Sequence, residues 1–218
     1  ESYAEINNFY TATVYEKGAE VIGMLRHLVG AQAYRAALDE YFRRHDGQAC
    51  TIEDWLAVFE DVTGRDLSQF KRWYTQAGTP RLRADWQITG HALRLRLRQD
   101  VPPTPGQPHK DPLVIPVVLG VLAPDGTALL PQTMVVLDRP ERVVGFDLAA
   151  LAAQAGVGVP DRVVPSLLRG FSAPVILDAP LTRDDRLVLL AHDTDPFTRW
   201  EAGRSLMRET LLGMLAGG

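Results

Sequence analysis

The sequence predicts a mixed α and β fold in several domains, because its hydrophobic period changes twice. Apolar residues recur at helical spacing up to about residue 80, alternate with a period of two up to about residue 180, and return to helical spacing from Thr182. With 218 residues, 46% of them hydrophobic and 23% charged, the chain is long enough for more than one core. We therefore expect three pieces: a helical segment at 1–80, a strand-rich segment at 81–180 and a second helical segment at 181–218.

The first helix is expected to begin at Val14 and to end at Gly30. Thr13 followed by Glu16 has the spacing of a capping box, which satisfies backbone N–H groups that a helix start leaves unpaired. Tyr15 then lies in the first turn, beside the stripe that faces the core. This stripe consists of Val14, Gly18, Val21, Ile22, Leu25, Leu28 and Val29.

Three further helices are expected before residue 80, and their short connections indicate packed antiparallel neighbours. Thr51 and Asp54 form a second capping box, and Gly64 is placed to end that helix. Asp66, with Gln69 three residues later, is expected to start the fourth helix. The side chains expected to face the core are Tyr34, Ala37, Leu38, Tyr41, Phe42, Trp55, Leu56, Phe59, Val62, Leu67, Phe70, Trp73 and Tyr74.

The segment 81–180 predicts a β-sandwich of short strands. Leucines at 93, 95 and 97 face one way and arginines at 94, 96 and 98 the other, which is typical of a half-buried antiparallel strand. The arginines could bind an anion, but 20 of the 23 basic residues are Arg, which favours an ordinary solvated face. Strands are expected at 82–88, 93–98, 113–122, 134–137, 142–146 and 175–178, with a hairpin turn at 124–126.

Two segments are expected to be surface loops without anchoring, namely 100–112, which contains five prolines, and the Ala- and Gly-rich 148–158. After Pro180, Thr182 with Asp185 caps one helix, and Asp195-Pro196 opens another. Two helices bury little by themselves, so this end is typical of the start of a longer helical array. The inward side chains of the last helix are expected to be Trp200, Leu206, Leu211 and Met214.

Composition excludes several classes of function. A net charge of −4 gives no basic face for a nucleic-acid partner. The longest apolar run, 113–123, is interrupted by Pro116 and is shorter than the roughly 20 residues that a bilayer span requires, so no membrane segment is expected. The single cysteine, Cys50, excludes an internal disulfide and suits a reducing compartment, which favours a cytoplasmic location.

No metal site is expected within the chain. A zinc peptidase helix carries a His-Glu-x-x-His motif, and none of the five histidines belongs to one. These histidines are His27, His45, His91, His109 and His192.

Tyr15 is the candidate catalytic residue. A phenol at the positive end of a helix macrodipole is a good hydrogen-bond donor to an oxygen that gains negative charge, which is the geometry of an oxyanion stabiliser. Cap and spacing alone are also compatible with an ordinary half-buried aromatic residue, and by themselves they favour it.

Residues 14–21, VYEKGAEV, resemble the zinc aminopeptidase N family. Residues 72–80, RWYTQAGTP, resemble the signature that closes the catalytic domain in the bacterial branch, and 171–175 and 197–202 are similar to later landmarks. The resemblance therefore covers essentially the whole chain. The stretch 148–158 is longer than is usual in that family.

The resemblance implies that 1–80 is the helical end of a thermolysin-like catalytic domain, 81–180 a β-sandwich and 181–218 the beginning of a helical C-terminal domain. It implies that Tyr15 donates to the tetrahedral intermediate and that Tyr10 and Asn7 lie near the substrate pocket. In the full-length parent, a zinc-activated water would attack the first bond of peptides with a free N-terminus. The present chain is then an inactive fragment that binds no zinc and lacks the N-terminal and C-terminal domains of its own protein.

Two alternatives stay open at this point. One is a leukotriene-hydrolase-like relative on the same scaffold, although the RWYTQAGTP form favours aminopeptidase N. The other is a catalytically inactive scaffold or peptide-binding homologue, against which the presence of Tyr15 argues. An intact His-Glu-x-x-His upstream would favour the peptidase.

Overall fold

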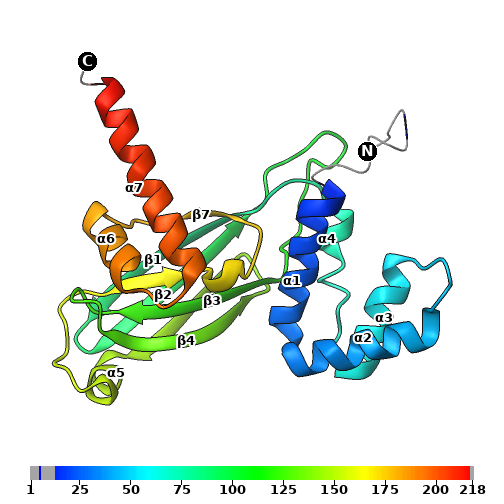
Figure 1. Ribbon diagram of the computed structural model, residues 1–218, viewed down its shortest axis with the longest axis horizontal. Helices are drawn as coiled ribbons and strands as arrows, with labels where there is room; N and C mark the ends of the chain where they lie inside the picture. The colour runs from blue at the N-terminus through cyan, green and yellow to red at the C-terminus, as the bar shows by residue number, and fades with distance from the viewer. Residues whose placement is uncertain (1–4, 6–12, 217–218) are drawn as a thin grey trace.

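The structure is a computed structural model that describes residue 5 and residues 13–216. A helical part, a two-sheet β part and a pair of C-terminal helices follow one another along the chain (Figure 1). The predicted mixed α and β fold, with a β-sandwich between two helical regions, is therefore confirmed.

The helical part begins with a π-helical turn, η2 (Thr13–Lys17), which continues into α1 (Gly18–Val29). Helical backbone therefore starts within one residue of the predicted position, although the side chain of Thr13, and with it the predicted capping box, lies outside the described part. The α1 helix buries Val21, Met24, Leu25 and Leu28 in the main core. Ile22, expected to face inward, is instead exposed.

Helices α2 (Ala31–His45) and α3 (Ile52–Thr63) form a hairpin beside α1. The capping box at Thr51 is confirmed, since Thr51 Oγ1 accepts from the Asp54 amide at 3.2 Å and the Asp54 carboxylate accepts from the Thr51 amide at 2.8 Å. Gly64 ends α3 in a left-handed conformation, as expected from its position.

The fourth predicted helix is wrong in its length. Only α4 (Arg72–Thr75) is α-helical, and residues 68–71 form turns. The Asp66 carboxylate accepts from the Ser68 amide, and Gln69 reaches across to the carbonyls of Pro112 and Asp138. Leu67, Phe70 and Trp73 are buried as expected, because packing onto the sandwich holds this segment without a regular helix.

The sandwich consists of a four-stranded sheet in the order β5-β2-β1-β7 and a three-stranded sheet in the order β4-β3-β6. Neighbouring strands are antiparallel except for the parallel pair β1 and β7. The strands are β1 (Arg81–Thr89), β2 (Ala92–Asp100), β3 (Ile115–Leu122), β4 (Ala128–Leu137), β5 (Glu141–Asp147), β6 (Val164–Leu167) and β7 (Ile176–Asp178).

Sequence patterning explains which strands could be predicted. On β2 the leucines are buried and the arginines exposed, so its alternation gives a clear signal. All eight residues of β3 are buried, because one face meets the other sheet and α1 and η3 (Arg169–Phe171) contact it. The missed strand β6 is four residues long and fully buried, so it shows no alternation.

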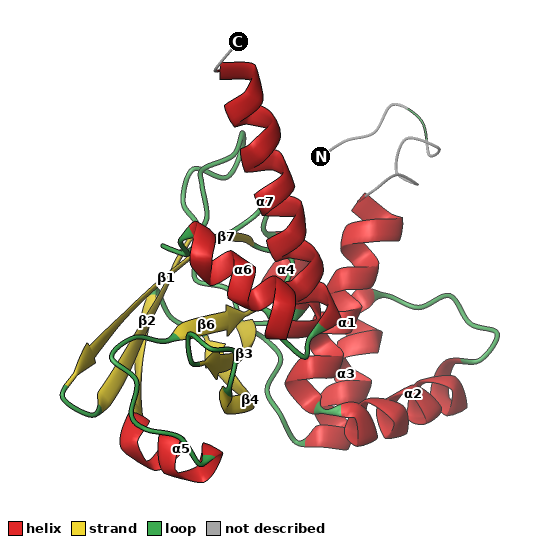
Figure 2. Cartoon of the chain, turned by 60° about the vertical axis from the view of Figure 1, so that its left-hand side comes forward, coloured by secondary structure: helices red, strands yellow, loops and turns green. Residues whose placement is uncertain are grey.

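Both predicted unanchored loops are corrected. Residues 148–155 form α5 (Leu148–Ala155), capped by Asp147 and ended by Gly156, with Leu148 and Ala152 buried (Figure 2). The segment 100–112 is a loop, as its prolines require, but its side chains are hydrogen-bonded to residues 75–77. The alternation of apolar residues and the proline content depend on neighbouring residues only. They therefore could not predict the hydrogen bonds between this loop and residues 75–77.

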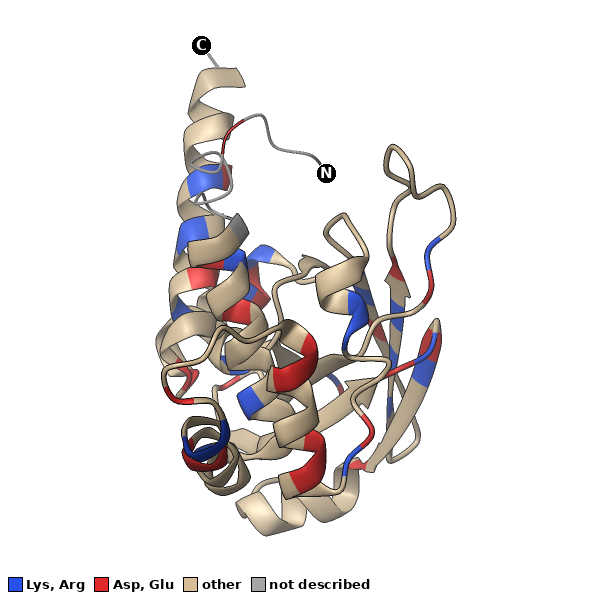
Figure 3. Cartoon of the chain, turned by 90° about the vertical axis from the view of Figure 1, so that its right-hand side faces the viewer, with Lys and Arg blue, Asp and Glu red and all other residues tan. Residues whose placement is uncertain are grey.

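Helices α6 (Arg183–His192) and α7 (Pro196–Ala216) pack on the sandwich next to η3. The Thr182–Asp185 capping box is confirmed, and Asp195 caps α7 by accepting from the Thr198 amide at 2.8 Å. Leu206 is buried as expected, but Trp200, Leu211 and Met214 are exposed. The last turns of α7 project from the rest of the chain and carry no charge (Figures 1 and 3).

Limited proteolysis with a non-specific protease should cut first within 156–162. This segment is mostly exposed, whereas 101–112 is held by hydrogen bonds to α4 and the turn that follows it. The position of the first cut is to be read by mass spectrometry. Earlier cleavage within 101–112 or within α5 would contradict this anchoring.

Candidate functional site

Tyr15 lies on η2, the π-helical turn that precedes α1. π-Helical turns are rare and are found frequently at functional sites. Tyr15 exposes 67% of its surface, although the opposite face of α1 is fully buried. Among the described residues, the hydrophobic core therefore leaves most of the Tyr15 surface uncovered. The other two predicted site residues, Tyr10 and Asn7, lie outside the described residues.

Lys17 is the last residue of η2 and points toward a distant part of the chain. Its ammonium donates to the carbonyl of Gly78 at 3.1 Å, across 61 residues of sequence. Lys17 is half-buried, and burial lowers the pKa of its ammonium below the usual value. The contact joins the Tyr15 turn to the segment that enters β1.

Residues 75–78 are held from the other side by the loop 101–112. Gln107 donates to the Thr75 carbonyl at 2.9 Å and accepts from the Ala77 amide at 2.8 Å. Lys110 donates to the Ala77 carbonyl at 2.8 Å. The segment that receives Lys17 is thus fixed by side chains of the sandwich.

The residues of RWYTQAGTP dock the helical part on the sandwich. Trp73 Nε1 donates to the Val114 carbonyl at 2.8 Å, and Arg72 donates to the Pro112 carbonyl at 2.7 Å. Gln76 exchanges two hydrogen bonds with the backbone of Asp111. This motif therefore satisfies backbone groups that lie just before β3.

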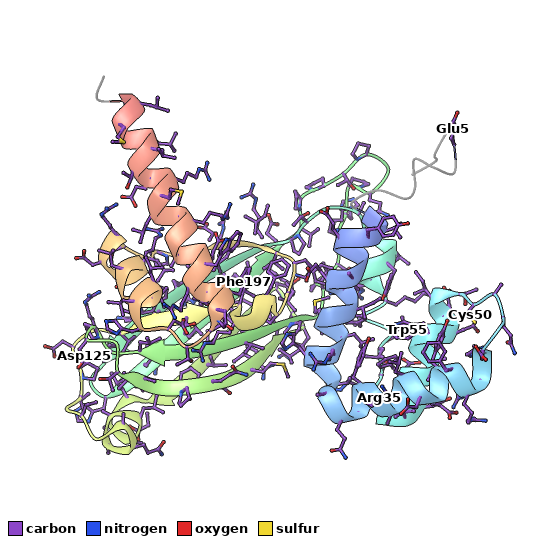
Figure 4. All side chains as sticks on the ribbon, in the orientation of Figure 1. Glu5, Arg35, Cys50, Trp55, Asp125 and Phe197 are labelled. Carbon is purple, nitrogen blue, oxygen red and sulfur yellow. The ribbon has the colours of Figure 1, made fainter. Side chains whose placement is uncertain are left out.

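Tyr74 belongs to an aromatic region between α2, α3 and α4. Its ring centroid lies 6.4 Å from that of Phe70, and the ring centroid of Trp55 lies 5.1 Å from that of Tyr41. Figure 4 shows Trp55 on the α2–α3 hairpin. Burial raises the pKa of Tyr74 to about 12, with a smaller contribution from Tyr34. This cluster is apolar packing, as its helical spacing indicates.

A separate pocket of about 480 Å³ lies between η3, β7, α6 and α7. Phe171 and Phe197, with ring centroids 4.9 Å apart, form part of its wall. Figure 4 labels Phe197 near the start of α7. Arg204 at its rim is paired with Glu201 at 2.7 Å and lies over Trp200. The pocket is lined only by residues from 167 onward, so it is distinct from the Tyr15 turn.

The arginine face of β2 is a solvated, ion-paired surface. Arg96 lies 3.8 Å from Glu141, and Arg98 lies 3.4 Å from Asp85. Acidic and basic segments accordingly lie together on these strands (Figure 3). This arrangement favours the solvated face over an anion site.

Within residues 13–216 no group of three or more His, Cys, Asp or Glu side chains could hold a metal ion. All five histidines belong to this range. The described residues therefore do not fit a zinc site by themselves.

The sequence motif singled out Tyr15, which stays a prediction, and gave no indication of the contact between Lys17 and Gly78 or of the loop beside it. One signal was available: Lys17 lies four residues before Val21, which is on the buried face of α1. A lysine on such a face needs an acceptor for its ammonium. Its partner is 61 residues away, and no local pattern identifies it.

Three protein-family profiles match successive parts of the chain. Residues 1–74 match the "Peptidase family M1 domain". Residues 78–180 match a domain of unknown function, DUF3458, described as an Ig-like fold, and residues 183–218 match DUF3458_C, described as ARM repeats.

Relatives of known name match nearly the whole chain. Aminopeptidase N of Caulobacter vibrioides is 48% identical over 218 residues, covering 99% of this chain, and that of Escherichia coli is 36% identical over 93% of it. A solved structure of Legionella pneumophila aminopeptidase A in complex with aspartic acid has a TM-score of 0.83 at 27% identity, covering 99% of this chain. The chain spans about a quarter of these proteins: 24%, 23% and 24% of their lengths respectively.

The free energy of unfolding should fall as the pH rises from 10 toward 12. The pKa of Tyr74 is about 12 in the folded state and near 10 in the unfolded state. Its contribution to the free energy of unfolding is therefore complete below pH 10 and is lost as the pH rises from 10 toward 12, because the unfolded state ionises first. Tyr74→Phe should make this fall shallower. Urea unfolding of the chain at several pH values tests this: the two proteins should run parallel between pH 7 and 9, and equal slopes above pH 10 would contradict the assignment to Tyr74.

Proposed function

The chain belongs to the M1 family of peptidases, in its bacterial aminopeptidase N branch, and we propose that it is part of a zinc-dependent enzyme that removes N-terminal residues from peptides. The observation that carries this proposal is the exposed Tyr15 on its π-helical turn, within a chain 48% identical to an aminopeptidase N. A phenol presented in this way can meet a substrate that the rest of the protein binds.

Tyr15 is proposed to stabilise the oxyanion that forms when the scissile carbonyl becomes tetrahedral. Its hydroxyl would donate a hydrogen bond to that oxygen, and the amides at the start of the helix add a positive potential. A donor of this kind acts on the transition state more than on the bound substrate. Tyr10 and Asn7 are proposed to contact the substrate.

Zinc is proposed to be held by residues of the longer protein outside this chain, because the described residues do not fit a metal site. The contribution of this chain to the reaction is then the hydrogen bond from Tyr15 and the framework that holds it.

The domains are proposed to divide near Pro80 and Pro180, giving the helical end of a thermolysin-like domain at 1–80, the sandwich at 81–180 and the start of a helical domain at 181–218. The uncovered apolar side chains of α7 support an extension of the helical domain. The proposed partners are peptides with a free N-terminus and the remaining domains of the same protein. In the described part of the chain no helix combines the length and apolarity needed to cross a bilayer. A cytoplasmic location is proposed from the single cysteine.

In the full-length protein, Tyr15→Phe should lower kcat by on the order of 10² to 10³ and leave KM and zinc content nearly unchanged. The substitution keeps the ring and removes only the hydroxyl, so an effect confined to kcat isolates a bond made in the transition state. Steady-state kinetics on aminoacyl chromogenic substrates and metal analysis measure the three quantities.

The matched control is Tyr41→Phe, which removes a hydroxyl from the α2–α3 region and should leave kcat unchanged. Normal turnover in the Tyr15→Phe protein would end the catalytic assignment. Absence of peptidase activity in the full-length protein would favour the scaffold alternative.

The 218-residue chain by itself should retain no stoichiometric zinc after dialysis and should release no amino acid from the same substrates. The reason is that its described residues supply no metal-ligand group. Metal analysis and a chromogenic assay decide this directly. Bound zinc at one equivalent together with turnover would refute the interpretation of this chain as an inactive fragment.

A further inference from the structure

We propose that Lys17 is a positioning residue for Tyr15, and that the loop 101–112 of the sandwich holds the carbonyl to which Lys17 is fixed. The inference rests on the proposed function of Tyr15. It means that the β-sandwich helps to position the Tyr15 side chain of the helical part.

Lys17 is placed to control the Tyr15 turn. It is two residues from Tyr15 and is the junction at which the π-helical turn becomes the α-helix. A π-turn is intrinsically rare, so an outside contact is expected to hold it. The 3.1 Å bond from the Lys17 ammonium to the Gly78 carbonyl is such a contact, and it lies in a half-buried place where an ammonium needs an acceptor.

Gly78, whose carbonyl accepts from Lys17, has a restricted backbone conformation. Gly78 has φ +99°, which residues with side chains rarely adopt, and a Cβ there would lie 3.4 Å from Thr104 Cγ2 and 3.6 Å from the Pro102 carbonyl oxygen. The backbone of residue 78 therefore lies directly against the loop 101–112. Its positive φ favours glycine, whereas a Cβ would meet the loop at ordinary van der Waals distance.

The loop supports the preceding residues through two polar side chains. The Gln107 side chain donates to the Thr75 carbonyl and accepts from the Ala77 amide, and the Lys110 ammonium donates to the Ala77 carbonyl. Lys110 also donates to Thr104 Oγ1 at 2.7 Å and to Gln107 Oε1 at 2.7 Å, so the loop is braced internally. The contacts run without a gap from the loop through 77–78 to Lys17, and from there along the backbone to Tyr15.

Loss of Lys17 should therefore misplace the Tyr15 hydroxyl without removing it. A displacement of about 1 Å at a reacting centre can cost about 10²-fold, so a smaller shift should cost less than deletion of the hydroxyl. In the full-length enzyme, Lys17→Met is expected to lower kcat by about 10-fold, with KM little changed. Lys17→Arg, which keeps a donor, should recover part of the loss.

The matched control is Lys71→Met. Lys71 pairs with Glu53 of α3 at 2.6 Å on the surface of the helical part, so this change removes a lysine from an ion pair that does not include Gly78 or the loop 101–112. It should leave kcat unchanged. Lys110→Met tests the loop and should change kcat in the same direction as Lys17→Met, by a smaller factor.

A double-mutant cycle with Tyr15→Phe separates positioning from an independent or merely structural role. If Lys17 acts through the Tyr15 hydroxyl, Lys17→Met should cost nothing further once that hydroxyl is gone. An equal fold-loss in both backgrounds, or normal kcat in Lys17→Met, would overturn the proposal. A normal kcat in the Tyr15→Phe protein would instead contradict the proposed catalytic role of Tyr15.

Hydrogen exchange gives a readout that does not depend on turnover. Lys17→Met in the full-length protein should speed exchange of the backbone amides of residues 15–19 several-fold relative to Lys71→Met, because the π-turn loses its outside contact. Unchanged exchange would refute the role of Lys17, even if the full-length protein proved to have no peptidase activity.

Discussion

The arrangement of the chain depends on the pairing of backbone groups that lie just outside the sheet. The carbonyls of Pro112 and Val114 accept from Arg72 and Trp73 of the helical part. Gln99 Nε2 similarly donates to the Leu113 carbonyl at 2.8 Å. Buried backbone groups left unpaired are costly, so these side chains stabilise the segment that leads into β3. The same bonds fix how the helices meet the sandwich.

The attachment of the helical part to the sandwich also affects the surroundings of Tyr15. Because α4 is hydrogen-bonded to the segment before β3, residues 75–78 contact both the loop 101–112 and Lys17 of η2. The Tyr15 turn is thus supported by a segment that is itself held by another domain. Preorganisation of a hydrogen-bond donor requires support of this kind, since the donor must be in place before charge develops.

Local chemistry made much of the fold predictable. The capping boxes at Thr51 and Thr182 and the leucine-arginine alternation of β2 each involve residues within a few positions of one another. Strand β6, the hydrogen bonds of the loop 101–112 and the exposed faces of α7 depend on partners far along the chain or outside it. For the same reason Tyr15 could be singled out from its motif, while the contact between Lys17 and Gly78 could not.

The hydrogen bonds that RWYTQAGTP donates to 111–114 end on main-chain oxygens, alongside an ion pair between the side chains of Arg72 and Asp111 at 3.7 Å. Every residue type offers a carbonyl, so these hydrogen bonds do not depend on the side chains of residues 112–114. Substitutions at 112–114 can therefore preserve these particular hydrogen bonds, whereas Gln107 and Lys110 of the same sandwich contribute through their side chains. On the helical side the donors are particular side chains, so sequence constraint falls unevenly on the two partners of a single interface. A short motif can in this way stay constant while the domain beneath it diverges.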